Sequence, residues 1–314
     1  MKNFALIGAA GYIAPRHMKA VKESGNALVA AFDTNDSVGV IDQFFPKASF
    51  FTEFERFDRH INKLYRSEVE RVDYIAIATP NYLHDAHMRF SLNSGANAIC
   101  EKPLVINPWN LDALIEVEQK CAKRVFGILQ LRLHPSIKKL KAELEKERNK
   151  NTHDIDLTYV TSRGNWYLNS WKGDVQKSGG IATNIGIHFF DVLSYLFGEV
   201  RINKVHLLTD TRASGYLELT SAKVRWFLSI DETDLPQECQ DKGEKTYRSL
   251  KIGGQNIEFS SGFNDLHTES YINILNGDGF GLETTRSSVE IVSQIRNAKI
   301  EPLLGDYHPL ATTK

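Results

Sequence analysis

The apolar segment ATNIGIHFFDVLSYLF (182–197) carries three polar side chains at offsets of four and three residues: Asn184, His188 and Asp191. In a helix, side chains three or four residues apart lie on one face, so these three would form a single stripe. An imidazole titrates near neutral pH and can take the proton of a hydroxyl group, and a neighbouring carboxylate can orient it or accept its proton. His188 is therefore a candidate general base, with Asn184 and Asp191 as supporting residues. The alternative is a histidine that is simply hydrogen-bonded at the start of a helix.

Lys102 is the second candidate reactive group, because it precedes Pro103 at the expected carboxyl end of a buried strand in ANAICEKP (96–103). An ammonium group there can donate a hydrogen bond to an oxygen that gains negative charge. The sequence leaves open whether the Lys102–Pro103 peptide bond is cis or trans, and an ordinary surface lysine in a turn is the alternative. A base and such a donor are the groups that hydride transfer from a secondary alcohol requires.

The opening stretch KNFALIGAAGYIAPRH (2–17) places Gly8 and Gly11 between an apolar run, 4–7, and a helix expected to begin near Pro15. The run is typical of a strand buried on both faces of a parallel sheet, and proline loses no hydrogen bond at a first helical position. Glycine at such a junction lets a pyrophosphate approach the free N–H groups at the positive end of the helix. The pattern G-x-x-G-x-x-A differs from the G-x-G-x-x-G fingerprint, however, and alone it also fits a tight turn.

An acidic residue after the next strand favours the cofactor interpretation. The segment ALVAAFD ends in Asp33, 22 positions after Gly11, close to the spacing at which a carboxylate binds an adenosine ribose diol. Thr34 and Asn35 follow, with no arginine directly after Asp33, so a phosphate on the ribose would meet a carboxylate and no cation. We therefore expect NAD rather than NADP. The alternative is an exposed aspartate that closes a strand.

Two further strands are expected in 72–80 and 96–103, separated by a helical segment, 81–95, at the spacing of α/β units. The first third is thus predicted to be a Rossmann-type, doubly wound parallel sheet. In such sheets ligands bind beyond the carboxyl ends of the strands. That edge would carry Gly8, Asp33, Thr79 to Asn81 and Glu101 to Pro103.

The second half is expected to form an α+β domain. A strand-like VFGILQLRL (125–133) with Gln130 and Arg132 leads to a charged helix, 135–150, and β-rich segments follow from Asp154 onward. These segments are IDLTYVTSRG, INKVHLLTD, SGYLELTS, KVRWFLSID, YRSLKIGG and QNIEFSSG. Their alternation predicts a large, mostly antiparallel sheet with one covered face. We place the domains at 1–124 and 125–314, with a final helix, 283–298, expected to pack back near the first domain.

Composition narrows the function classes. Of the 314 residues, 42% are hydrophobic and 25% are charged, which is typical of a globular protein. Lys plus Arg (38) nearly balances Asp plus Glu (39), so nucleic acid is not an expected partner. The three cysteines, Cys100, Cys121 and Cys239, form no CxxC pair, which argues for a reducing, cytoplasmic location and against a structural metal. No signal peptide or membrane span is indicated.

Four motifs, in this order, resemble those of the Gfo/Idh/MocA oxidoreductases: the glycine turn followed by His17, ATPNYLH (78–84), CEKPL (100–104) and GGIATNIGIHFFDVL (179–193). Two departures from the family pattern stand out. Ala10 is like an insertion in the turn and Ala14 replaces a common glycine, while Asn184 stands where the family usually has aspartate.

The resemblance implies an NAD-dependent dehydrogenase whose open-faced sheet packs against another subunit in a dimer or tetramer. It implies catalytic roles for Lys102 and His188. The residues it places at the cofactor are Gly8, Gly11, Tyr12, Ile13, Asp33, Thr79, Asn81, His84, Glu101, Lys102 and Gln130. The opening and RGNWYLNSWKGD (163–174) are most similar to the WlbA/WbpB group, which oxidises the C3 hydroxyl of UDP-N-acetylglucosaminuronic acid in making surface polysaccharide, such as lipopolysaccharide O-antigen.

A uronic acid substrate adds a carboxylate, which the guanidinium fork of arginine binds well. Arg163 is the candidate at the end of its strand, and Trp166 or Tyr167 would pack against sugar or nicotinamide, unless either belongs to the core. Gln130 and Arg132 would line the cleft. The rivals are the same chemistry on another nucleotide sugar, a free sugar or inositol, and a non-catalytic NAD-binding sensor. Release of NADH, or its reoxidation on the enzyme by 2-oxoglutarate, is left open.

Overall fold

The computed structural model of the chain describes residues 1–146, 152–257 and 265–312. Its contacts divide the chain into two compact units. The first comprises Met1–Gln130 and Asn264–Arg286, and the second comprises Leu131–Phe263 and Ser287–Lys314. The units are described separately below.

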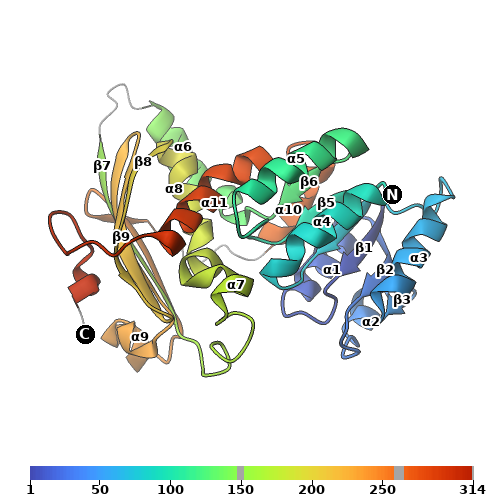
Figure 1. The fold of residues 1–314 in the computed structure, drawn as a ribbon, viewed down its shortest axis with the longest axis horizontal. Coiled ribbons are helices and arrows are strands. Elements are labelled where there is room, and N and C mark those ends of the chain that lie inside the picture. The colour runs from blue at the N-terminus through green and yellow to red at the C-terminus, as the bar shows by residue number, and fades with distance from the viewer. Residues whose placement is uncertain (147–151, 258–264, 313–314) are drawn as a thin grey trace. The chain divides into compact units, whose positions relative to one another are not determined.

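The first unit is built on a six-stranded parallel sheet with the order β3-β2-β1-β4-β5-β6 (Figure 1). The strands are β1 (Asn3–Ile7), β2 (Ala27–Phe32), β3 (Ser49–Phe51), β4 (Tyr74–Ile77), β5 (Asn97–Cys100) and β6 (Val125–Gly127). Short apolar runs form these strands because a parallel sheet is covered on both faces. The doubly wound sheet predicted for the first third is thus confirmed.

Helices alternate with these strands. They are α1 (Ala14–Glu23), α2 (Ile41–Phe44), α3 (Phe54–Tyr65), η1 (Asn81–Leu83), α4 (His84–Asn93) and α5 (Trp109–Cys121). Helix α10 (Leu266–Leu275) comes from late in the chain but belongs to this unit, where Tyr271 stacks on Phe4 of β1 with ring centres 5.8 Å apart. The first turn of α11 (Leu282–Asn297) also belongs here, and Arg286 binds Asp112 of α5 at 2.8 Å.

The second unit contains a six-stranded sheet with the order β12-β11-β7-β10-β9-β8. Figure 1 labels β7, β8 and β9 of this sheet. Its strands are β7 (His153–Thr161), β8 (Val200–Leu208), β9 (Arg212–Leu219), β10 (Ala222–Ser229), β11 (Thr246–Ile252) and β12 (Gln255–Ile257). Only the β7–β10 pair is parallel among the described pairings, so the mostly antiparallel sheet is confirmed.

Helices of the second unit are α6 (Pro135–Lys146), α7 (Val175–Ser178), the π-helical turn η3 (Ala182–Gly186), α8 (Ile187–Phe197), α9 (Gln237–Asp241) and most of α11. One face of the sheet packs on η3 and α8: Phe190 meets Trp226 edge to face at 5.3 Å between ring centres. On the other face Phe227 stacks on His308, beside η5 (Pro309–Thr312). The chain's own C-terminal segment therefore covers part of the face predicted to be open.

Three sequence predictions need correction or limits. The strand predicted over 125–133 ends at Gly127, and Gln130 and Arg132 lie on the 3-10 turn η2 (Gln130–Leu133). A continuous apolar run has no periodicity to mark where the chain leaves the sheet. The boundary predicted after residue 124 also differs from the division after Gln130, because β6 completes the parallel sheet. The ends of the predicted segments 135–150 and QNIEFSSG lie outside the described residues.

The segment Val175–Phe197 is long and apolar enough to cross a membrane, but 72% of its most apolar window is buried inside the protein. It packs against the second sheet, as a core helix of a globular protein does.

Candidate active site

The glycine turn of the first unit is held by neighbouring strand ends. Gly8 has φ +93°, and a Cβ atom there would lie 2.7 Å from the carbonyl carbon of Ala78, which follows β4. Only glycine fits this combination of backbone conformation and close approach. The N–H of Gly8 donates to the carbonyl oxygen of Phe32 at 2.8 Å, which fixes the turn beside the end of β2.

Asp33 lies where the sequence predicted a ribose-binding carboxylate. Its Oδ2 accepts from the N–H of Ala10 at 2.9 Å and its Oδ1 from the N–H of Asn35 at 2.9 Å. Each oxygen has a second lone pair, and the side chain is partly exposed, so both can accept from a diol. Ala10, the apparent insertion, thus links the turn to Asp33. The turn and the carboxylate fit the adenosine end of NAD.

Two other predicted cofactor residues are oriented differently. Tyr12 is 91% exposed, whereas the side chain of Ile13 packs against the apolar core of the first unit.

The loops after β4 and β5 are joined by a buried histidine. His84 Nδ1 lies 2.7 Å from the carbonyl oxygen of Pro103, and Nε2 lies 2.8 Å from that of Thr79. Both ring nitrogens are therefore directed at loop carbonyls. Thr79 also approaches His87 at 3.1 Å, and Asn81 is buried in η1. Through these contacts His84 holds the carboxyl edge of the sheet, where the sequence predicted the cofactor.

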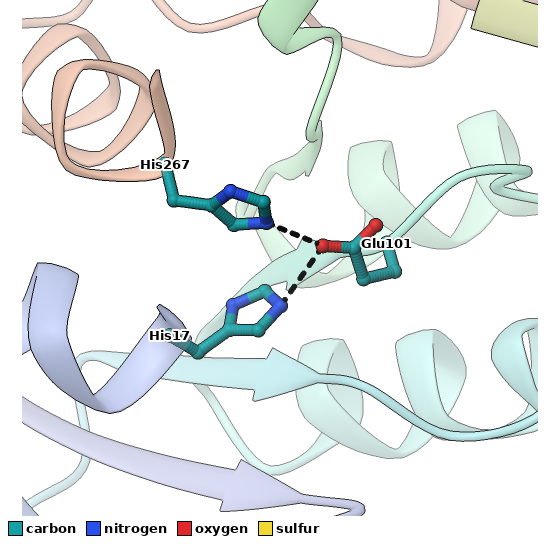
Figure 2. Close-up of side chains that lie close together, drawn as sticks. All are labelled: His17, Glu101 and His267. Carbon is teal, nitrogen blue, oxygen red and sulfur yellow. Dashed lines mark hydrogen bonds and ion pairs between the residues drawn. The ribbon is translucent and has the colours of Figure 1, made fainter. Parts of the chain in front are cut away.

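Lys102 follows β5, and its peptide bond to Pro103 is cis. Its backbone N–H donates to Oε2 of Glu101 at 3.3 Å. The other oxygen, Oε1, lies 3.1 Å from His17 Nε2 and 2.8 Å from His267 Nε2 (Figure 2). Burial alone would raise the pKa of Glu101, but hydrogen bonds from the two imidazoles outweigh it and hold that pKa well below its usual range. Glu101 is thus a buried carboxylate beside the candidate reactive lysine.

No role was predicted for His267 or Tyr271 from the sequence, and His17 was recognised only as part of a motif. His267 and Tyr271 lie four residues apart on α10, and Tyr271 Oη lies 2.7 Å from His17 Nδ1. The four-residue spacing of His267 and Tyr271, which puts both on one face of a helix, was a usable signal. Their partners lie far away in the sequence, so spacing could not have identified them.

The residues His17, Glu101 and His267 are also of metal-ligand type, with ligand atoms within 4.8 Å of one another. In the described part of the chain no other such group occurs.

In the second unit the candidate base lies just after a π-helical turn. Asn184 is within η3 and His188 is in the first turn of α8. Such π-helical turns are frequent at functional sites. The Nδ2 of Asn184 donates to Tyr167 Oη at 2.5 Å.

Asp191 forms an ion pair that the sequence did not indicate. Both of its oxygens accept from the guanidinium of Arg132, at 2.7 and 2.8 Å. Burial raises the pKa of Asp191, and the bonds from Arg132 oppose that rise. Arg132 is itself buried and lies over the ring of Tyr195 at 4.7 Å. This buried ion pair anchors α8 to η2, and the predicted roles of Asp191 beside His188 and of Arg132 at the cleft stay predictions.

The predicted substrate residues differ in exposure. Arg163 is exposed just after β7, and Trp166 is 55% exposed. Tyr167 is only 2% exposed and, with Lys172 and Arg296, helps to line a cavity of about 170 Å³ in the second unit. Tyr167 is thus largely buried and Trp166 largely exposed, with their rings edge to face at 5.8 Å between centres, and a role of either in substrate binding stays a prediction.

Comparison with known proteins decides the family. A family model described as an oxidoreductase family, NAD-binding Rossmann fold, matches residues 2–127, and the model of its C-terminal α/β domain matches 150–233. The chain belongs to the Gfo/Idh/MocA family. The first unit is accordingly an NAD-binding domain of an oxidoreductase.

Members of the Gfo/Idh/MocA family with solved structures include close relatives. The WlbA (WbpB) dehydrogenase of Thermus thermophilus is 49% identical, with 96% of this chain and 97% of that one covered and a TM-score of 0.93. Its structures are described as complexes with NAD and alpha-ketoglutarate and with NAD and UDP-GlcNAcA. The WlbA dehydrogenase of Bordetella pertussis, 18% identical with a TM-score of 0.77 and 94% of both chains covered, shares the fold.

Among curated Gfo/Idh/MocA relatives, glucose-6-phosphate 3-dehydrogenase of Bacillus subtilis is 26% identical over 88% of this chain and 79% of its own length. The putative oxidoreductase YteT of the same species is 25% identical over 49% of this chain, and the chain spans only 36% of YteT's length.

Proposed function

We propose that the protein oxidises the C3 hydroxyl of UDP-N-acetylglucosaminuronic acid to a 3-keto sugar nucleotide, with NAD as the hydride acceptor. The observation that carries this proposal is the 49% identity, over nearly the whole chain, to a Thermus thermophilus dehydrogenase whose structure is described with NAD and UDP-GlcNAcA. Glucose-6-phosphate 3-dehydrogenase of Bacillus subtilis is named for oxidation at position 3 of its sugar, which supports the same position here.

The chain's own residues have distinct roles in this proposal. When it is bound, NAD would accept the hydride from C3 of the sugar. His188 takes the proton of the C3 hydroxyl group, and Lys102 donates a hydrogen bond to the oxygen that loses it. Arg163 binds the uronate carboxylate through its guanidinium fork. Its exposure just after β7 supports this assignment.

Further parts of the proposal rest on the relatives and on composition. A relative is described with alpha-ketoglutarate, which supports 2-oxoglutarate as a co-substrate that reoxidises NADH on the enzyme. We assign the protein to a homo-oligomer, a dimer or tetramer, as the family resemblance implies. All three cysteines lie among the described residues and are free thiols, which fits the cytoplasm. The product would serve lipopolysaccharide O-antigen sugar synthesis, as the WlbA/WbpB resemblance implies.

Calorimetric titration with UDP separates this function from the same chemistry on a free sugar or inositol. A nucleotide-sugar enzyme binds UDP, since most of the substrate's polar groups lie in that part. We expect saturable binding of UDP to the NAD-loaded protein and no comparable heat with myo-inositol. Binding of inositol without UDP would contradict the nucleotide-sugar assignment.

A further inference from the structure

The strongest unassigned feature is the network around Glu101. Figure 2 shows the imidazoles of His17 and His267 pointing from α1 and α10 to the same carboxylate oxygen. His17 is fully buried, and Glu101 and His267 are exposed by less than a tenth. A buried carboxylate is strongly destabilising unless hydrogen-bond donors surround it. The chain therefore holds this charge with donors brought from two distant segments.

The protons in the network can be assigned. Burial raises the pKa of Tyr271 well above its usual value, so its O–H is retained and donates to Nδ1 of His17. Burial lowers the pKa of His17, although its bond with Glu101 opposes this, so the ring is neutral and its proton lies on Nε2. That N–H and the N–H of His267 then both donate to Glu101. The Tyr271 hydroxyl thus sets which nitrogen of His17 carries the proton, and the two imidazole N–H groups together set the orientation of the Glu101 carboxylate.

Lys102 lies between two anchored residues. Before it, Glu101 is held by the two imidazoles and accepts the Lys102 backbone N–H. After it, the carbonyl oxygen of Pro103 is bound by His84. The direction of the lysine side chain depends on this backbone, and a shift of about 1 Å in a catalytic group can reduce a rate about a hundredfold.

We propose that His267, together with His17, is a positioning residue for Lys102 and acts through Glu101. Helix α10, although it comes late in the chain, thus helps to hold Lys102, which lies just after the end of β5. This inference rests on the proposed function for the role of Lys102. The hydrogen bonding itself belongs wholly to the first unit.

Three variants test the inference in the full-length, NAD-loaded protein. His267→Leu removes the donor and keeps the bulk, whereas His267→Gln keeps an N–H donor. Ser270→Ala is the matched control, because Ser270 lies on the same helix and its Oγ donates to the Leu266 carbonyl oxygen within that helix. Hydrogen exchange at the peptide containing Lys102, the dissociation constant of NAD and kcat are measured for each variant.

For His267→Leu we expect faster exchange at Lys102, a fall in kcat of roughly tenfold to a hundredfold and NAD affinity within about threefold of the wild type. The Gln variant restores both exchange and kcat, and Ser270→Ala changes neither. If His267→Leu does not fold, Tyr271→Phe replaces it, since it removes the O–H that fixes His17 and keeps the ring. Its expected effect on exchange has the same sign.

Unchanged exchange and kcat in folded His267→Leu would overturn the inference, as would an equal loss in the Gln variant. A stoichiometric metal ion in elemental analysis, lost in His267→Leu, would also overturn it in favour of a metal centre. If the wild type fails to oxidise any UDP-sugar, the proposed function fails. The exchange result then still decides whether His267 holds the Lys102 backbone.

Discussion

His188 is the residue on which the proposed proton transfer most depends. In His188→Asn the amide cannot act as a base, so we expect kcat to fall by about 10²- to 10⁴-fold. NAD affinity should stay within about twofold, because the NAD-binding domain is the first unit and His188 is in the second. Stopped-flow absorbance and NAD fluorescence titration measure the two quantities.

The matched control for this variant is His153→Asn, which changes a histidine of the same unit at the start of β7. It should retain wild-type kcat. A fully active His188→Asn enzyme would remove His188 from its role, and an inactive control would show that the unit tolerates neither substitution.

At the scale of elements, the parallel strands were the most predictable part of the structure. The strands β1, β2, β4 and β5 were predicted from short apolar runs, such as those that end before Gly8 and Asp33, and burial on both faces produces such runs; β3 (Ser49–Phe51) was not predicted. The break after Gly127 was not predictable, because Ile128 and Leu129 continue the apolar run.

The site was predicted unevenly for a similar reason. Residues in local motifs, such as Lys102 and Asp33, were found because strand ends put them at one edge. The partners of Glu101 and Asp191 were missed, since His267 and Arg132 reach them through tertiary packing across long sequence separations.

The glycine turn gives a prediction for an element. Gly8→Ala combines a positive φ of +93° with a Cβ only 2.7 Å from backbone of Ala78, so the turn must shift. Gly25→Ala is the matched control, with φ +74° but open space around the new Cβ. The control should lose about 1 to 2 kcal/mol of unfolding free energy. Gly8→Ala should lose more and also weaken NAD binding at least tenfold.

Urea unfolding and NAD titration measure these effects. Equal stability losses in the two variants would mean that the close approach at Ala78 is not a real constraint. Wild-type NAD affinity in Gly8→Ala would contradict the placement of the cofactor at this turn.

At the scale of the whole molecule, buried neutral histidines predict loss of stability in acid. Burial lowers the pKa of His87 and of His308 to about 4 from 6.5. Below pH 6.5 the unfolded chain binds these protons before the folded one does, so unfolding becomes easier as the pH falls toward 4. Each group can contribute at most about 3 kcal/mol over that range.

Chemical denaturation at several pH values between 7 and 4 checks this prediction. His87→Leu and His308→Leu should each flatten the dependence of unfolding free energy on pH. The two residues belong to different units, so their effects should add. An unchanged slope in both variants would show that these histidines titrate alike in the folded and unfolded chains.

The central claim is tested most directly by following nicotinamide absorbance when the purified protein and NAD are mixed with UDP-N-acetylglucosaminuronate, with and without 2-oxoglutarate. We expect a 3-keto sugar nucleotide to form in this mixture. Reduced nicotinamide accumulating without the keto acid would indicate release of NADH, and product that requires 2-oxoglutarate would indicate recycling on the enzyme. If neither reduced nicotinamide nor keto sugar forms under either condition, the proposed substrate is contradicted.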